Sequence, residues 1–267
     1  MQKSLTKMGL PLEDSIFSLL IPTNDLTILV LMVATFFISG IVKGFLGIGL
    51  PAAAMGLLTL VVSPSHAISL LVLPIFFTNL SQFLRSQERV QTVTLYWPFA
   101  VTIVICIFMT SLFLEKYPVG LLTIAIGVAM VVFALNGLSK FRLKLGPEKY
   151  WQIFLGMISG ILGGLSSIWS PPVAMYLVAR DLDKERFIAA TGFLFLIGSV
   201  PLALGLFLGG TLNLAVMLQS LTGLIAVLLG FRIGENLRSR VDQKLFQKAV
   251  LIAFTIMGVR LIAVGIF

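Results

Sequence analysis

Cysteine and histidine are almost absent from this sequence, which holds one of each, Cys106 and His66. A lone cysteine can form no disulfide within the chain and no cysteine-based metal site. Intramembrane proteolysis needs a serine with a histidine or a pair of aspartates, and no Asp lies in any apolar run. Metal catalysis lacks the ligands it requires. We therefore expect no enzymatic activity and no cofactor.

Charge is also scarce in this chain. Asp, Glu, Lys and Arg make up 11% of the 267 residues, whereas hydrophobic residues make up 58%, and the mean hydropathy is +1.06. A helix needs roughly 20 apolar residues to cross a bilayer, and several runs without a formal charge are long enough. The sequence therefore predicts a multi-pass membrane protein. The longer runs are 90–114, 117–139, 150–179 and 187–231, and a shorter one is 249–259.

The positive charge that gives the chain its net +8 is gathered in four short segments. Segments 85–92, 139–149, 180–186 and 232–248 hold most of the 19 Lys and Arg residues. The positive-inside rule places such segments in the cytoplasm. No polar surface with interleaved aromatic and basic residues is present, so we expect no nucleic-acid partner.

The sequence contains an internal repeat, in which two copies of one membrane unit are separated by 120 residues. Each copy runs from an apolar helix through a glycine-rich break to a proline that restarts a helix, as in transporters built from internal repeats. We expect an interfacial N-terminal segment at 1–25, a first repeat at 26–138, a cytoplasmic linker at 139–149 and a second repeat at 150–267. The repeated residues are Ile38, Ser39, Gly40, Ile41, Gly44, Pro51, Ala54 and Met55, which recur as Ile158, Ser159, Gly160, Ile161, Gly164, Pro171, Ala174 and Met175.

The lengths of the apolar segments predict the topology. Segments 52–62 and 171–179 are too short to cross the bilayer, so each forms a hairpin with the preceding helix and adds zero or two crossings. Three helices follow each hairpin, so each half crosses an odd number of times and the second half is inverted. We predict an all-α polytopic protein of two inverted-topology repeats of about five helical segments, each beginning with a hairpin broken by Gly and Pro, with both termini outside. The expected helices are 26–46, 52–62, 66–84, 93–114, 118–138, 151–166, 171–179, 187–208, 212–232 and 247–265.

The two hairpin tips are the candidate binding site. An unwound backbone inside the membrane is tolerated only where protein or a polar cavity satisfies its N–H and C=O groups, and glycine allows a ligand to approach it closely. A proline that restarts a helix leaves the positive N-terminal end facing the break, which favours an anion. We expect a small, polar, negatively charged substrate bound by Lys43, Gly44, Gly47, Gly49, Pro51, Ser166, Ser167, Ser170 and Pro171.

Some of these glycines also fit a purely structural role. Gly40 with Gly44 and Gly160 with Gly164 have the spacing that lets membrane helices pack closely. For these four residues the pattern favours packing, whereas for Gly47, Gly49 and the three serines it favours the site.

Lys43 is the only Lys, Arg, Asp or Glu between Asp25 and Arg85. A cation within the membrane is costly and usually faces a cavity or a partner. No acidic residue lies in an apolar run, so a bound anion is the natural counter-charge. The alternative is a lysine that extends its amino group to the membrane surface.

Four other polar residues carry weaker signals for a pathway or a gate. His66 begins a helix and fits an interfacial cap or a proton-linked role. Asn79 and Gln82 lie on one side of a helix and either line the pathway or bond a neighbouring helix. Arg180 belongs to a mixed-charge loop that is either a solvated face or an inner gate.

At the two hairpins the chain resembles the sulfite exporter TauE/SafE family of bacterial membrane proteins. This resemblance implies export of sulfite, sulfoacetate or a related organosulfur anion across the inner membrane. The second tip departs from the glycine-rich first tip at Ser167, Trp169 and Ser170, so the substrate can differ from sulfite. The matching residues are Gly40, Gly44, Gly47, Gly49 and Pro51, their echo at Gly160, Gly164 and Pro171, and Gly209, Gly210, Asn213, Gly230, Arg232 and Arg240.

Two alternatives to an anion exporter remain open at this level. An inverted-repeat transporter of the drug/metabolite type explains the repeat but not the early Gly/Pro hairpins. A non-catalytic scaffold subunit would leave the tips dry and packed. The sequence leaves the oligomeric state open.

Overall fold

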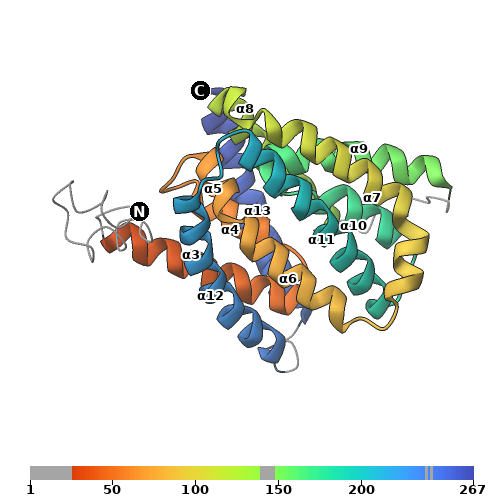
Figure 1. Ribbon diagram of the computed structural model, residues 1–267. Coiled ribbons are helices and arrows are strands. Elements are labelled where there is room, and N and C mark those ends of the chain that lie inside the picture. The colour runs from red at the N-terminus through yellow and green to blue at the C-terminus, as the bar shows by residue number, and fades with distance from the viewer. Residues whose placement is uncertain (1–25, 139–147, 238–239, 241–242) are drawn as a thin grey trace, which may run out of the picture.

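The computed structural model describes residues 26–138, 148–237, 240 and 243–267, and its regular elements there are all helices (Figure 1). The expected segment 1–25 and most of the expected linker 139–149 lie outside the described residues. The first half holds α3 (Leu26–Leu46), α4 (Leu50–Leu58), α5 (Pro64–Leu70), α6 (Val72–Arg85), α7 (Arg89–Leu112), the 3-10 turn η2 (Leu114–Lys116) and α8 (Val119–Leu138). The second half holds α9 (Lys149–Ser166), α10 (Ser170–Ala179), α11 (Lys184–Leu208), α12 (Leu214–Leu237) and α13 (Gln243–Ile266).

Seven helical spans in the described part of the chain are long and apolar enough to cross a membrane. Many large apolar side chains on them are exposed, among them Trp97, Ile225 and Ile256. A soluble protein would bury such side chains, whereas lipid accommodates them. The prediction of an all-helical, multi-pass membrane protein is confirmed.

One expected helix, 66–84, is instead divided into α5 and α6 at Leu71. Pro74 has no N–H to donate to the Leu70 carbonyl four residues earlier. The Ser220 hydroxyl of α12 donates to that carbonyl at 2.7 Å and accepts from the Leu73 N–H at 3.3 Å. The helix is therefore interrupted where a distant side chain replaces its own hydrogen bonds.

Helices of the two halves pack directly against each other, most extensively α3 against α12. A Cβ atom on Gly40 would strike the Val227 carbonyl oxygen, and one on Gly44 would strike that of Phe231. From the first pair to the second, the residue number increases by four on both helices. The two helices therefore run parallel, with their backbones in contact. The structure thus places Gly40 and Gly44 in a helix interface.

α9, the first helix of the second half, packs in the same way against a helix of the first half. α9 packs along α7, where a Cβ atom on Gly160 would meet Cys106 and one on Gly164 would meet Thr110, so these helices are also parallel. The last helices of the halves, α8 and α13, are antiparallel, because Gly120 lies on Gly265 and Gly127 on Gly258. α6 and α11 form the remaining large contact between the halves.

The described residues of the four cation-rich segments lie together at one end of the protein. Arg85, at the end of α6, forms a salt bridge of 3.3 Å with Glu235 near the end of α12. The ammonium of Lys149, at the start of α9, lies 5.7 Å from the ring centre of Trp97 in α7. Segment 180–186 lines a surface cavity together with the start of α7. We call this end the cationic end.

Candidate functional site

Each half holds one break between a long helix and a short one. α3 ends at Leu46, after which Gly47 and Gly49 have φ angles of 82° and 94°, which glycine adopts without strain. α9 ends at Ser166, and Ser167 has a φ of 59°. That left-handed conformation is unfavourable for a residue with a Cβ atom. Ser167 therefore holds a strained backbone at the position that corresponds to Gly47.

Both short helices begin at these breaks without a side-chain cap. α4 begins with Leu50 and Pro51, and α10 with Ser170, Pro171 and Pro172. Proline suits the first turn because it needs no hydrogen-bond partner for its nitrogen. The remaining first-turn N–H groups and the positive end of each helix dipole are directed at the break.

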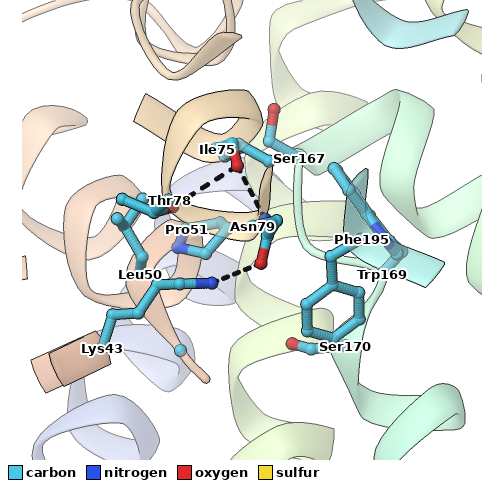
Figure 2. Close-up of a pocket in the computed structure, with 11 residues that line it drawn as sticks. Lys43, Leu50, Pro51, Ile75, Thr78, Asn79, Ser167, Trp169, Ser170 and Phe195 are labelled. Atoms are coloured by element: carbon cyan, nitrogen blue, oxygen red, sulfur yellow. Dashed lines mark hydrogen bonds between the residues drawn. The ribbon is translucent and has the colours of Figure 1, made fainter. Parts of the chain in front are cut away.

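The two breaks meet at one internal cavity, which we call the central cavity (Figure 2). Its volume of about 10 Å³ is room for about one water molecule, so it is closed in this conformation. α6 and α11 complete its wall. The lining residues are Lys43, Gly49, Leu50, Pro51, Ile75, Thr78, Asn79, Ser167, Trp169, Ser170 and Phe195.

Lys43 is the charged group of the central cavity and is 2% exposed. Its ammonium donates a hydrogen bond to Oδ1 of Asn79, whose Nδ2 in turn donates to the Ile75 carbonyl at 2.7 Å (Figure 2). The Asn79 side chain is therefore held with its carbonyl toward Lys43. No Asp or Glu is among the residues that line the cavity, and Lys43 has no ion-pair partner among the described residues. Its positive charge is thus buried without a counter-charge among the described residues.

Three polar groups on residues that line the central cavity have no hydrogen-bond partner in the described part of the chain. They are the hydroxyls of Ser167 and Ser170 and the indole N–H of Trp169. Their side chains are at most 4% exposed, and each buried polar group left unpaired costs about 1–3 kcal/mol. Figure 2 shows Trp169 and Ser170 across the cavity from Lys43. The residues that line this space therefore carry four hydrogen-bond donors and no acidic group.

Trp169 was not among the binding residues expected from the sequence. Its indole N–H is a donor only, and its ring stands edge-on to Phe195, with centroids 6.0 Å apart. The sequence feature that could have indicated Trp169 as a site residue was its place in the second tip, 120 positions after Gly49. Only the fold turns this side chain into the cavity.

Four of the expected binding residues do not line the central cavity, namely Gly44, Gly47, Ser166 and Pro171. Gly44 contacts α12, as described above. The Ser166 hydroxyl donates to the Leu162 carbonyl at 2.6 Å and accepts from the Ile168 N–H at 3.1 Å. It stabilises the turn rather than facing the cavity.

The residues expected to line a pathway or a gate are dispersed. Asn79 lies in the central cavity, as described. Gln82 bonds α6 to α11 through the Ile188 carbonyl at 2.8 Å. His66 is half-buried on α5 and does not line the central cavity. Arg180 lines a separate cavity at the cationic end.

Comparison with known proteins identifies one family. The model of the family described as "Sulfite exporter TauE/SafE" matches residues 32–261. No curated protein and no solved structure matches the chain. The matched region contains both helix breaks and every residue of the central cavity. Because the match covers most of the chain, the protein belongs to the sulfite exporter TauE/SafE family and is a membrane transporter, not an enzyme.

Proposed function

We propose that this protein exports a small anion, such as sulfite, sulfoacetate or a related organosulfur anion, and that it binds this anion in the central cavity. The observation that carries the proposal is the buried charge of Lys43, which lines the cavity together with Ser167 and Ser170, whose hydroxyls are unpaired, and with no acidic residue. A bound oxyanion would compensate the charge and accept hydrogen bonds from the ammonium and from cavity hydroxyls.

The backbone at the two helix breaks also favours an anionic ligand. α4 and α10 both direct uncapped N-termini at the cavity, and the N-terminus of a helix attracts anions. A scaffold protein would gain nothing from unpaired buried polar groups, which lower its stability. The closed volume leaves no room for an oxyanion, so the walls must separate before one binds.

We further propose that the two halves are inverted repeats that rock against each other to expose the cavity alternately to the two sides. The Arg85–Glu235 salt bridge places the start of α7 beside the end of α12. α3 runs parallel to α12 and so toward this end, whereas α9 runs parallel to α7 and so away from it. The opposite directions of α3 and α9 support the inversion.

The charge distribution supports an orientation with the cationic end in the cytoplasm and both termini outside. The membrane potential, negative inside, then favours anion exit by about 2.3 kcal/mol per charge per 100 mV. Export down this electrical gradient needs no coupled ion.

Flux measurements with the purified protein in liposomes test the proposed function. We expect sulfite and small sulfonates to leave loaded liposomes, faster when an imposed potential pulls anions outward, while choline and amino-acid cations stay inside. Protein-free liposomes are the control. If no sulfur oxyanion moves, or if cations move equally well, the proposed function is wrong.

Replacing Ser167 by glycine should raise stability and lower transport together. Glycine relieves the left-handed backbone, a gain of about 1 kcal/mol, and removes an unpaired buried hydroxyl. Loss of this hydrogen-bond donor should raise the KM for the anion several-fold. Thermal unfolding in detergent and liposome flux measure the two effects.

The contrasting variant is Ser166→Gly, because this neighbouring hydroxyl is fully engaged in the turn. It should lower the unfolding temperature. An unchanged KM in Ser167→Gly would exclude the Ser167 hydroxyl from the binding site.

A further inference from the structure

A second cavity opens at the cationic end, between the start of α7 and the segment that joins α10 to α11. Its volume is about 370 Å³. Gln91, Asp183 and Arg186 line it and are exposed, whereas Tyr96 lines it and is 3% exposed. We call it the vestibule. It is large enough for a hydrated small anion. Tyr96 is the aromatic residue of its inner wall, and both acidic residues (Glu88, Asp181 and Asp183) and basic residues (Arg180 and Arg186) line it.

A cluster of three aromatic rings lies behind this wall. Tyr96 stands edge-on to Tyr176 with ring centroids 6.3 Å apart, and Phe99 stands edge-on to Tyr176 at 5.6 Å. All three side chains are buried. Tyr176 therefore joins the vestibule wall to the protein interior.

α10 extends from the central cavity to the vestibule. Ser170 at its start lines the central cavity, and Arg180 just after its end lines the vestibule. Val173 and Tyr176 lie between them at intervals of three or four residues, which places all four on one side of the helix. Tyr176 is thus located between the two cavities.

Gln152 supplies polar groups at the aromatic cluster. Its Nε2 donates to the Tyr176 hydroxyl at 3.3 Å and to the Leu95 carbonyl at 3.2 Å, while its buried Oε1 has no partner among the residues that the structure describes. A purely structural contact would pair both ends of this amide. An amide with an unused end can bond water or a passing solute when the rings separate.

From this arrangement we propose that the vestibule is the cytoplasmic access to the central cavity and that the Tyr96–Tyr176 pair is the constriction that closes it. This inference rests on the proposed anion transport, since it describes how the anion reaches its site. The other half is built differently: Gly56 stands 120 positions before Tyr176 and lies against Met130 and Met257. At the position of the first half that corresponds to Tyr176, there is therefore no tyrosine to form such a constriction.

The experiment measures access to the central cavity without measuring transport. Cys106 is the only cysteine, so Cys106→Ala gives a background in which Ser170→Cys is the single thiol. Inside-out vesicles expose the cytoplasmic side to a membrane-impermeant, negatively charged thiosulfonate reagent. We expect slow labelling of Ser170→Cys, and labelling about tenfold faster when Tyr176→Ala is added, because truncation opens the constriction.

Two controls separate a gate from general loosening. Tyr150→Ala removes an exposed aromatic side chain of α9 and should leave the labelling rate unchanged. In right-side-out vesicles, Tyr176→Ala should not accelerate labelling, whereas a loosened protein would label faster from both sides.

The outcomes distinguish this inference from the proposed function. Faster labelling from the cytoplasmic side alone supports the access route even if the liposomes show no sulfite flux. An unchanged rate, or equal acceleration from both sides, overturns the route even if anion transport is established.

Discussion

Replacing Lys43 by methionine should abolish anion transport while leaving the protein folded. Methionine has a similar length, so it retains the packing of the aliphatic stem but removes the only charge in the central cavity. Removing one partner of a buried, hydrogen-bonded charge pair costs about 2–5 kcal/mol of binding, so flux at a fixed anion concentration should fall more than about thirtyfold. Liposome flux and anion-dependent thermal stabilisation measure the loss.

The stability of the same variant tests whether the lysine is a functional group. An uncompensated buried ammonium destabilises the empty protein by more than an unpaired Asn79 carbonyl does. The unfolding temperature of Lys43→Met should therefore not fall, and adding Asn79→Leu should keep it at or above the wild-type value. Lys116→Met, at an exposed lysine on the η2 turn, is the matched control and should transport normally. Normal flux in Lys43→Met would remove Lys43 from the site.

Replacing Gly44 by leucine should prevent stable folding. The new Cβ atom would collide with the Phe231 backbone carbonyl, which cannot move without separating α3 from α12. Overpacking a well-packed contact costs about 1–3 kcal/mol for a few added atoms, and a whole leucine side chain between two backbones should exceed that range. The expected result is loss of the monodisperse peak in size-exclusion chromatography and a large fall in the unfolding temperature.

Gly210→Leu provides the matched control for this substitution. Gly210 has a φ of 83°, so leucine is strained there, but no atom lies within 4 Å of the added Cβ. It should lose only about 1–2 kcal/mol. If Gly44→Leu were no worse than Gly210→Leu, the close contact between α3 and α12 would not stabilise the fold.

The sequence predicted Lys43 as a residue of the site but did not predict Trp169. A single cation in a long apolar run predicts a buried functional charge, because the cost of burying it is a local property. Its partner Asn79 lies 36 positions away. From the sequence, Asn79 fitted equally a residue that lines the pathway and one that bonds a neighbouring helix. Trp169 reads as an apolar residue in a turn, and only the tertiary packing of α11 against its ring places it in the wall of the cavity.

The positions and breaks of the membrane helices followed from the chain alone, because the length of apolar runs and the turn preferences of glycine and proline act over a few residues. The division of 66–84 into α5 and α6 did not, since the proline that frees the Leu70 carbonyl needs Ser220 from α12 to satisfy it. The small-residue spacing favoured packing for Gly40, Gly44, Gly160 and Gly164, but only the tertiary structure decided which helices these glycines contact. That choice depends on packing between residues more than fifty positions apart, and no local pattern contains it.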